Sequence, residues 1–293
     1  MLDYERELEL RAGTRLQVGR GKSKEAEIVK TGDAEDSRDA LSPAAMKRTV
    51  GVIGGMGPAA TVDFLARIIA ATPAERDQDH LHVLVDCDPA VPDRTAYLRR
   101  EGPDPRPALI AMASRLELAG ADFLVMPCNT AHAFADDIRA KVAIPLVDWP
   151  SVVADAVAAT GVTQVGILAS TGTLMADVYR GPLERRGLRA VVPTPPAQAK
   201  VMRAIYGSEG VKHLGPASPV ARQDLLSGAL DVIAQGTGAL ILACTEFSAI
   251  SAVQSLEAKV PVLDASQIVA RHVVARALGL AAMAAAVSDG AGR

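Results

Sequence analysis

The chain has 293 residues, of which 49% are apolar and 22% charged, and its 31 basic and 34 acidic residues give a net charge of −3. No basic excess is present to neutralise phosphates, and no apolar stretch reaches the roughly 20 residues of a membrane-spanning helix, so we expect neither a nucleic-acid nor a membrane partner. Three cysteines are too few for a disulfide scaffold, and no secretory segment is visible, which predicts a cytoplasmic protein with reduced thiols.

The first 47 residues differ from the rest in composition, because they hold 10 acidic and 9 basic residues and few large apolar ones. A segment of this kind buries too little surface to offset the entropy lost on ordering. We therefore predict a disordered extension over 1–47. The alternative is that Met46 is the true start, since it is followed almost directly by an apolar strand.

From Val50 onward, short runs rich in β-branched residues alternate with longer segments rich in Ala and Leu. This alternation predicts an α/β fold, an open parallel sheet with helices on both faces. The runs expected to be buried parallel strands are 50–53, 82–86, 123–126, 145–147, 164–168, 240–242 and 261–263. The segments expected to be helices are 61–71, 107–118, 131–141, 151–159, 174–186 and 221–234. Gly-Pro pairs such as Gly181-Pro182 are expected at the joins.

The chain contains an internal repeat. A glycine followed after eight residues by a cysteine, and after a further twenty by an aspartate, occurs as Gly120, Cys128 and Asp148 and again as Gly236, Cys244 and Asp264. A Val-Gly pair precedes the two cysteines by 78 and 79 residues. The repeat predicts two similar Rossmann-like lobes with parallel sheets, related by a pseudo-twofold axis, with an active site between them.

The predicted boundaries follow from these frames. We expect a first lobe over 48–150 and a second over 151–264. The remaining segment, 265–293, is expected to contribute a C-terminal helix that packs back on the first lobe.

Each repeated cysteine ends an apolar strand and opens a helix, at the sheet edge where open α/β folds build their sites. Free N–H groups at such an edge favour a thiolate. A lone cysteine there is more often a small structural residue, which is how we interpret Cys87, but duplication would place Cys128 and Cys244 at one cleft. Two opposed thiols suit proton removal from one face of a carbon acid and proton delivery to the other, which inverts a stereocentre. Such a reaction needs carboxylate-binding donors and a dry site.

Two basic residues are candidate carboxylate anchors. Arg94 lies in the loop Pro92–Thr95 and could bind a carboxylate through two N–H groups, or be an exposed loop arginine. Lys212 is one of four lysines after residue 50, and taken alone it is more readily interpreted as a surface residue. His132, four residues after Cys128, could tune that thiolate or be an exposed helix histidine.

The loop after the first strand fits G-x-G-x-x-A through Gly55, Gly57 and Ala60, which could indicate dinucleotide binding. Asp86, the acidic residue ending the next strand, comes 31 residues after Gly55, which is late for a ribose contact, and the repeated cysteines would go unexplained. We therefore expect the backbone amides of this loop to approach a small anion.

Four motifs together resemble the aspartate/glutamate racemase family, in its aspartate racemase branch. They are Gly54-Gly55-Met56-Gly57-Pro58, Pro92-Asp93-Arg94-Thr95, Pro127-Cys128-Asn129-Thr130-Ala131-His132 and Cys244-Thr245-Glu246, and the similarity extends from about residue 47 to 280. The resemblance implies a homodimeric racemase that interconverts L- and D-aspartate, or glutamate, by two-base proton transfer. It also implies an enzyme without cofactors, using neither pyridoxal phosphate nor a metal.

The resemblance assigns roles residue by residue. Cys128 and Cys244 would be the base and acid pair, with Glu246 beside the second cysteine. Arg94 and Lys212 would bind substrate carboxylates. The other residues lining the substrate would be Met56, Asn129, Thr130 and Thr245.

Two departures from the family pattern leave other functions open. Ala243 stands where the family usually has glycine, and the acids of Asp86-Cys87-Asp88 make a preference for a dicarboxylate less certain. One alternative is an isomerase or decarboxylase of another small dicarboxylic acid. The other is a non-catalytic protein that binds a small anion.

Overall fold

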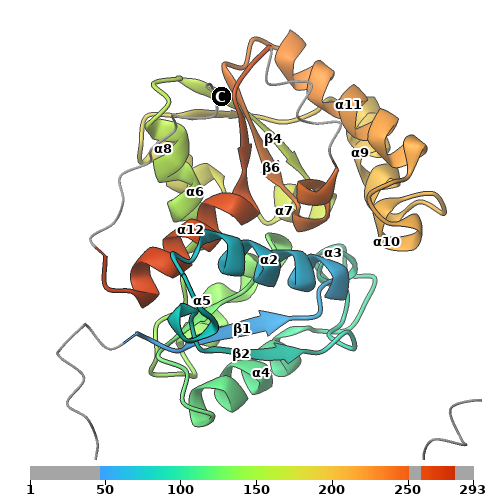
Figure 1. Cartoon of the computed structure of the whole chain (residues 1–293). Helices are drawn as coiled ribbons and strands as arrows, with labels where there is room; N and C mark the ends of the chain where they lie inside the picture. The colour runs from blue at the N-terminus through green and yellow to red at the C-terminus, as the bar shows by residue number, and fades with distance from the viewer. Residues whose placement is uncertain (1–46, 251–258, 281–293) are drawn as a thin grey trace, which may run out of the picture. The chain divides into compact units, whose positions relative to one another are not determined.

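The computed structural model describes residues 47–250 and 259–280, and its strands form two parallel sheets (Figure 1). The first sheet has the order β2-β1-β3, with β1 (Val50–Gly54), β2 (Val83–Cys87) and β3 (Phe123–Val125). The second has the order β5-β4-β6-β7, with β4 (Gln164–Ala169), β5 (Arg189–Val191), β6 (Ala239–Ala243) and β7 (Val262–Asp264). The predicted α/β fold with helix-flanked parallel sheets is confirmed.

Helices connect the strands in both halves. Those before β4 are α2 (Pro58–Ala71), α3 (Arg94–Leu98), α4 (Arg106–Leu118), α5 (Ala135–Arg139) and α6 (Trp149–Ala158). Those after it are α7 (Thr171–Met175), α8 (Arg180–Glu184), α9 (Pro195–Tyr206), α10 (Val211–Leu214), α11 (Pro219–Ala234) and α12 (Ala265–Ala277). Short 3-10 turns are η1 (Asp77–Asp79), η2 (Thr130–Phe134) and η3 (Thr245–Ala249).

The two sheets share one strand order. The strand expected over 145–147 is reduced to a single parallel bridge between Leu124 and Leu146. The bridge extends the first sheet next to β3, in the same way that β7 extends the second sheet next to β6. The repeat seen in the sequence therefore corresponds to a repeat of topology.

Alternating strand residues divide the interior into three hydrophobic layers. Val50 and Val52 of β1 belong to a core that both sheets share with α2, α6 and α12. Ile53, on the opposite face, belongs to a core closed by α4 and α5. The corresponding face of the second sheet is closed by α9 and α11. Cys128 and Cys244 belong to these two separate outer cores, so each packs on its own half.

The glycine of each repeated Val-Gly pair allows a helix to pack closely on the central strand. A Cβ atom at Gly51 would lie 2.8 Å from Cδ2 of Leu124 and 3.3 Å from Cβ of Leu116 in α4. A Cβ atom at Gly166 would lie 2.7 Å from Cγ2 of Val232 in α11. The distances to Leu124 and Val232 are shorter than real Cβ contacts and the distance to Leu116 is tighter than most, so any larger residue would force its neighbours to move away.

The repeated aspartates begin the helices that follow them. The Asp148 side chain accepts a hydrogen bond from the backbone N–H of Ser151 and caps α6. The Asp264 side chain accepts from the backbone N–H groups of Ser266 and Gln267 and caps α12. N-caps of this kind satisfy backbone donors that the helix leaves unpaired.

The helix α12 packs against both α2 and α6. Arg67 of α2 lies 3.0 Å from Oδ2 of Asp264 and donates to the carbonyl oxygen of Ser248 at 3.1 Å. At the other end of the helix, the backbone N–H of Arg48 donates to the carbonyl oxygen of Ala277 at 2.8 Å. These contacts join the end of the second sheet to the elements around β1.

The single helix expected over 174–186 is wrong. The chain forms two short helices there, α7 and α8, separated by Asp177 in the left-handed region at φ 55°. The Gly181-Pro182 pair, expected at a join, lies inside α8, where proline is tolerated because it falls in the first turn.

Other differences concern β2 and the segment 189–206. β2 is an edge strand, so its residues are only partly buried and Val85 is 41% exposed. β5 and α9 were not expected, since β5 is short and α9 opens with Pro195-Pro196, which suggests a loop but suits the first turn of a helix. The helix expected over 131–141 is divided into η2 and α5.

Two predictions fall on residues that the structure does not describe. The first is the disordered extension over 1–47, with its alternative start at Met46, of which the structure describes only Lys47. The second is the expected C-terminal segment, of which residues 281–293 lie outside the described range. In the described ranges, no helix has both the length and the apolar character needed to cross a membrane.

Candidate active site

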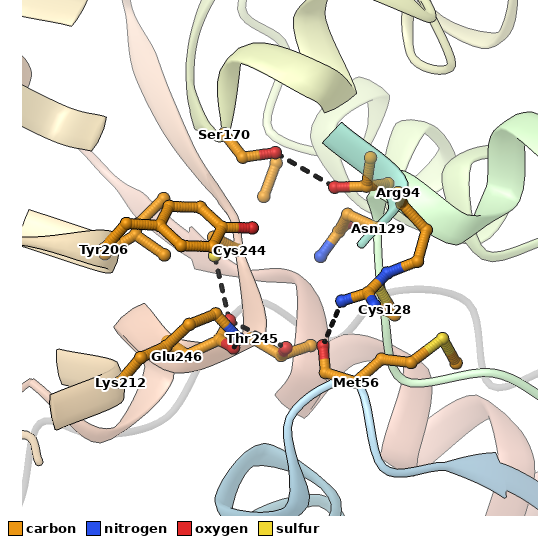
Figure 2. A pocket seen from close by; sticks show the side chains of 13 residues that line it. Met56, Arg94, Cys128, Asn129, Ser170, Tyr206, Lys212, Cys244, Thr245 and Glu246 are labelled. Atoms are coloured by element: carbon orange, nitrogen blue, oxygen red, sulfur yellow. Dashed lines mark hydrogen bonds and ion pairs between the residues drawn. The ribbon is translucent and has the colours of Figure 1, made fainter. Parts of the chain in front are cut away.

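A cavity of about 280 Å³, partly open to solvent, lies at the carboxyl ends of β1, β3 and β6 (Figure 2). All nine residues that the sequence analysis assigned to the site line it. Ser170, Ile205, Tyr206 and Ala243 complete the lining. The cavity is small, which suits a small-molecule ligand.

The lining residues come from both halves of the chain. Before β4 lie Met56 in the β1–α2 loop, Arg94 at the start of α3, and Cys128, Asn129 and Thr130 after β3. After β4 lie Lys212 in α10 and Cys244, Thr245 and Glu246 directly after β6. The two cysteines therefore reach one cavity from different sheets.

The guanidinium of Arg94 lies beside Cys128, and both side chains are buried. Burial opposes the charge of Arg94, but the negative charges that Cys128 and Asp93 carry when ionised outweigh it and raise the pKa of Arg94. A positive charge therefore lies directly beside the Cys128 sulfur.

Backbone carbonyls hold Arg94 in place. Asp93 caps the N-terminus of α3 and so fixes the start of the helix that carries Arg94. Nη1 of Arg94 donates to the carbonyl oxygens of Val91 at 3.3 Å and Pro92 at 3.1 Å, and Nη2 donates to that of Met56 at 3.3 Å. Nε has no partner among the described residues. The edge formed by Nε and Nη2 is thus available to bind an anion with two parallel hydrogen bonds.

Asn129 supplies a second donor on the same side. The residue is 3% exposed, and its Nδ2 has no hydrogen-bond partner within the described part of the chain. Figure 2 shows the amide nitrogen directed into the cavity, on the side of Arg94. Unpaired buried donors are costly, so a carboxylate bound here would satisfy both Asn129 and Arg94.

The second cysteine has the opposite surroundings. Sγ of Cys244 donates to Oε2 of Glu246 at 3.0 Å. Burial, and then the negative charge of Glu246, raise the pKa of Cys244 well above its ordinary value. Cys244 is therefore a protonated thiol at neutral pH.

Glu246 is held ionised by Lys212. Nζ of Lys212 lies 2.5 Å from Oε1 of Glu246. Burial disfavours both charges, but their mutual attraction raises the pKa of Lys212 and lowers that of Glu246. The ring of Tyr206 lies 5.6 Å from Nζ and adds a cation–π contact.

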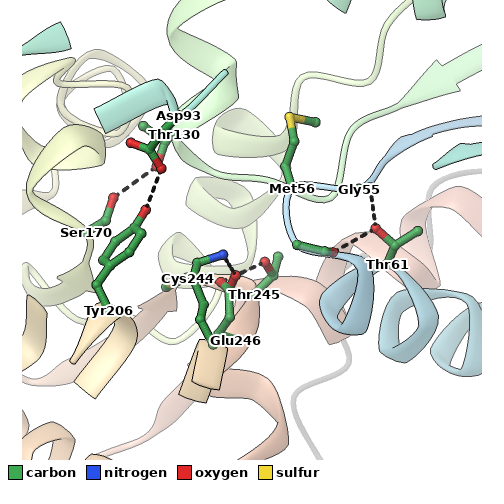
Figure 3. A network of polar contacts seen from close by, with 12 residues as sticks. Gly55, Met56, Thr61, Asp93, Thr130, Ser170, Tyr206, Cys244, Thr245 and Glu246 are labelled. Carbon is green, nitrogen blue, oxygen red and sulfur yellow. Dashed lines mark hydrogen bonds and ion pairs between the residues drawn. The ribbon is translucent and has the colours of Figure 1, made fainter. Parts of the chain in front are cut away.

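Buried hydroxyl groups join the two halves at the rear of the cavity. Oγ1 of Thr130 lies 2.9 Å from Oγ of Ser170 and 2.8 Å from Oγ1 of Thr173. The hydroxyl of Tyr206 donates to Oδ2 of Asp93 at 3.3 Å, next to the contact between Ser170 and Thr130 (Figure 3).

Sequence reasoning missed Ser170 and Tyr206. Ser170 follows β4, whose Val-Gly pair matches that of β1, so the repeat could have placed it at the same sheet edge as Gly55. Tyr206 ends α9, a helix that was not expected, and only its position six residues before Lys212 connects it with the site.

The glycine loop after β1 does not behave as expected. The backbone N–H of Gly55 donates to Oγ1 of Thr61 at 2.9 Å, so it is not available to a small anion. Gly55 has φ 93°, and a Cβ atom there would lie 2.4 Å from the backbone of Asp88. The loop requires glycine because it packs against the end of β2, which accounts for Gly55 without a dinucleotide.

His132 was expected either to tune the Cys128 thiolate or to be an exposed helix histidine, and the structure agrees with neither. It is buried, does not line the cavity, and its Nε2 lies 3.1 Å from the carbonyl oxygen of Met126. Burial, partly offset by that hydrogen bond, lowers its pKa to about 4. His132 is therefore neutral at pH 7 and packs behind the cysteine segment.

The acidic residues around Cys87 lie apart from the cavity. Cys87 is exposed, which contradicts its interpretation as a structural residue of the interior. Asp86 lies 2.7 Å from Nη2 of Arg115, and neither Asp86 nor Asp88 lines the cavity. These acids therefore do not alter the charge of the site. Over the described ranges, no three His, Cys, Asp or Glu residues are grouped so that they could hold a metal ion.

Comparison with known proteins identifies the family. The family described as Asp/Glu/Hydantoin racemase matches residues 53–273. The chain belongs to this family. The match covers more than half of the chain, including every lining residue of the cavity, and it confirms the family resemblance inferred from the motifs.

Individual relatives agree with this assignment. The chain is 25% identical over 233 residues to the broad specificity amino-acid racemase RacX of Bacillus subtilis, an alignment that covers 77% of this chain and 96% of RacX. It is 34% identical over 158 residues to a glutamate racemase of Pseudomonas aeruginosa, covering 53% and 57% of the two chains. The solved aspartate racemase of Picrophilus torridus is 28% identical with a TM-score of 0.68, covering 78% and 94%. Together they support a racemase acting on amino acids as the enzyme class.

Proposed function

We propose that the protein is a cofactor-independent racemase of acidic amino acids, in which Cys128 and Cys244 exchange protons with opposite faces of the substrate α-carbon. The observation that carries this proposal is that the two cysteines of the repeat, one from each sheet, line one small cavity. A reaction on a single face would leave the second cysteine without a role.

The surroundings of the two thiols support different roles for them in the resting enzyme, one as base and one as acid. Cys128, which lies beside the cation Arg94, is the base of the proposed reaction. The raised pKa of Cys244 keeps it protonated, so it can deliver a proton to the other face. After one turnover the two protonation states are exchanged, which allows the reverse reaction.

The α-proton of an amino acid is only weakly acidic, so the carbanion needs stabilisation. The free edge of Arg94 and Nδ2 of Asn129 are the donors that would bind the carboxylate next to the reacting carbon. Both side chains are buried, where a charge-assisted hydrogen bond is stronger than in water. Negative charge that spreads from the α-carbon into this carboxylate is thereby stabilised.

Lys212 supports a substrate with a second carboxylate. It is the second cation that lines the cavity, and its partner Glu246 belongs to the Cys244 end. In the proposed complex, Lys212 binds the side-chain carboxylate of aspartate or glutamate. Glu246 remains to accept a hydrogen bond from the substrate ammonium group.

The test is incubation of the full chain with L-aspartate in deuterated buffer. We expect loss of the α-hydrogen signal in proton NMR and formation of the D-enantiomer, detected by chiral chromatography. Cys128→Ser and Cys244→Ser should each abolish racemisation, while Cys87→Ser, which alters an exposed thiol outside the cavity, should leave it unchanged.

A panel of other compounds completes the test. It includes glutamate and amino acids with neutral and basic side chains, because RacX is named a broad specificity enzyme. Retention of full activity by both serine variants would contradict the two-base mechanism. Binding of L-aspartate without any exchange of the α-hydrogen would favour a small-anion binding protein instead.

A further inference from the structure

Tyr179 is a buried titratable residue that the mechanism above does not use. It precedes α8, is 2% exposed, and does not line the cavity. Its hydroxyl donates a short hydrogen bond to Oδ1 of Asn129, from a segment 50 residues away in the chain. Tyr179, which follows β4 in the chain, thus contacts the side-chain amide of the residue next to Cys128.

The Tyr179 hydroxyl is the donor of this hydrogen bond, and the carbonyl oxygen of Asn129 is the acceptor. Burial raises the pKa of Tyr179 far above its ordinary value, so the hydroxyl keeps the proton that it donates.

The amide of Asn129 is oriented by this contact. Its carbonyl oxygen accepts from Tyr179, and its Nδ2 faces the cavity without a partner among the described residues. The flipped amide would require the Tyr179 hydroxyl to accept instead of donate, and it would present a carbonyl oxygen to the cavity. A carbonyl oxygen there would repel a carboxylate instead of binding it.

We infer that Tyr179 is a positioning residue, whose hydroxyl holds the Asn129 side chain so that Nδ2 donates to a carboxylate of the substrate. This inference rests on the proposed function for the identity of the anion. Tyr179 acts only through Asn129 and does not touch the substrate itself.

The kinetic test is a double-mutant cycle of Tyr179→Phe and Asn129→Ala. We expect Tyr179→Phe to lower kcat/KM for L-aspartate about tenfold, the usual effect of losing one hydrogen bond to a charged group. In the Asn129→Ala background the same substitution should have almost no effect. Tyr97→Phe is the matched control, because the Tyr97 hydroxyl contacts Arg106 and lies outside the cavity lining. Equal losses in both backgrounds would overturn the inference.

A spectroscopic test does not depend on turnover. Asn129 is the only asparagine of the chain, so protein labelled with 15N-asparagine gives one pair of side-chain amide signals. We expect a single sharp pair in the ligand-free wild type and a shifted or broadened pair in Tyr179→Phe. Identical pairs in the two proteins would show that Tyr179 does not hold the amide.

The two proposals fail in different ways. A wild-type protein that neither binds nor racemises L-aspartate would reject the proposed function and the carboxylate as the partner of Nδ2. The ligand-free spectra would still decide whether Tyr179 orients Asn129. A normal melting temperature for Tyr179→Phe would separate loss of positioning from loss of the fold.

Discussion

The two cysteine segments occupy matching places in the repeat but differ in charge. Cys128 follows β3 and lies beside the cation Arg94. Cys244 follows β6 and donates to the carboxylate of Glu246. The residue two positions after each cysteine differs accordingly, because Thr130 joins a cluster of hydroxyls whereas Glu246 forms an ion pair.

This difference shows what duplication preserves in this chain. The repeated strands bring both thiols to the same edge of their sheets, because parallel strands end on one side. The charged neighbours of each thiol are not part of the repeat. They are Arg94 at the start of α3, beside Cys128, and Glu246 with its partner Lys212 of α10, beside Cys244. A repeated backbone thus carries a cation beside one thiol and a carboxylate beside the other.

Removing the cation beside Cys128 should have the largest effect. Arg94→Gln eliminates the cation beside Cys128 and the guanidinium donors that would bind a carboxylate. Losing two charge-assisted hydrogen bonds predicts a fall in kcat/KM of about 1,000-fold. Peptide mapping after iodoacetamide treatment should also show slower alkylation of Cys128 at neutral pH.

Two further variants control this prediction. Arg94→Lys keeps the charge but lacks the planar fork, so it should preserve rapid alkylation of Cys128 while losing most activity. Arg106→Gln removes an arginine that pairs with Asp104 outside the cavity, and it should leave both measurements unchanged. An Arg94→Gln enzyme with normal alkylation of Cys128 would mean that the thiolate is stabilised by something else.

An intermediate effect is expected at the other end of the cavity. Glu246→Gln removes the negative charge that helps to raise the pKa of Cys244, and Lys212 is left to lower it. The pH dependence of Cys244 alkylation should therefore move to lower pH, toward that of an ordinary cysteine. We expect kcat/KM to fall about tenfold, since the amide oxygen of glutamine accepts a weaker hydrogen bond from the thiol than a carboxylate does.

The control for this variant is an exposed glutamate of the same half. Glu184→Gln changes the net charge equally without touching the cavity, so neither Cys244 alkylation nor activity should respond. If the alkylation profile of Cys244 moved to higher pH in Glu246→Gln, the assignment of Cys244 as the resting acid would be wrong.

The sequence predicted the parts of the site that strand ends determine. Hydrophobic runs and repeat spacing located β3 and β6, and with them Cys128, Cys244 and the residues directly after each cysteine. The family resemblance added Met56, and it agreed with the choice of Arg94 and Lys212 as carboxylate anchors, which lie in the short helices α3 and α10. All of these residues meet in one cavity.

What the sequence did not predict depends on long-range contacts. Tyr206 reaches the cavity from α9, whose double proline suggested a loop. Tyr179 reaches Asn129 because the chain turns at Asp177, where a continuous helix was expected. Hydrophobic periodicity carries no information on either contact, since both are single hydrogen bonds between segments far apart in the chain.

The halves also differ four residues after each cysteine. In the second half Ser248 occupies this position and donates to Oδ1 of Asp264 at 2.7 Å. In the first half His132 occupies it, with the repeated Asp148 and the cation Arg139 as its charged neighbours. A neutral serine does not titrate, whereas a buried histidine does, so this position should lower stability in mild acid in the first half and not in the second.

His132→Gln tests this difference, with the smallest expected effect on activity because His132 does not line the cavity. The pKa of His132 is about 4 in the folded protein and near 6.5 when unfolded, so the unfolded chain binds the extra proton first as pH falls. Stability is therefore complete above pH 6.5 and declines between pH 6.5 and 4, by about 3 kcal/mol from this residue. Glutamine keeps an N–H donor for the carbonyl of Met126 but does not titrate.

Urea unfolding at pH 7.5 and 4.5 measures this difference. The free energy of unfolding should fall less for the variant than for the wild type, because all other titrating groups are common to both. Equal losses would place the acid sensitivity elsewhere, and His272, whose pKa is also lowered by burial, would be the next residue to replace.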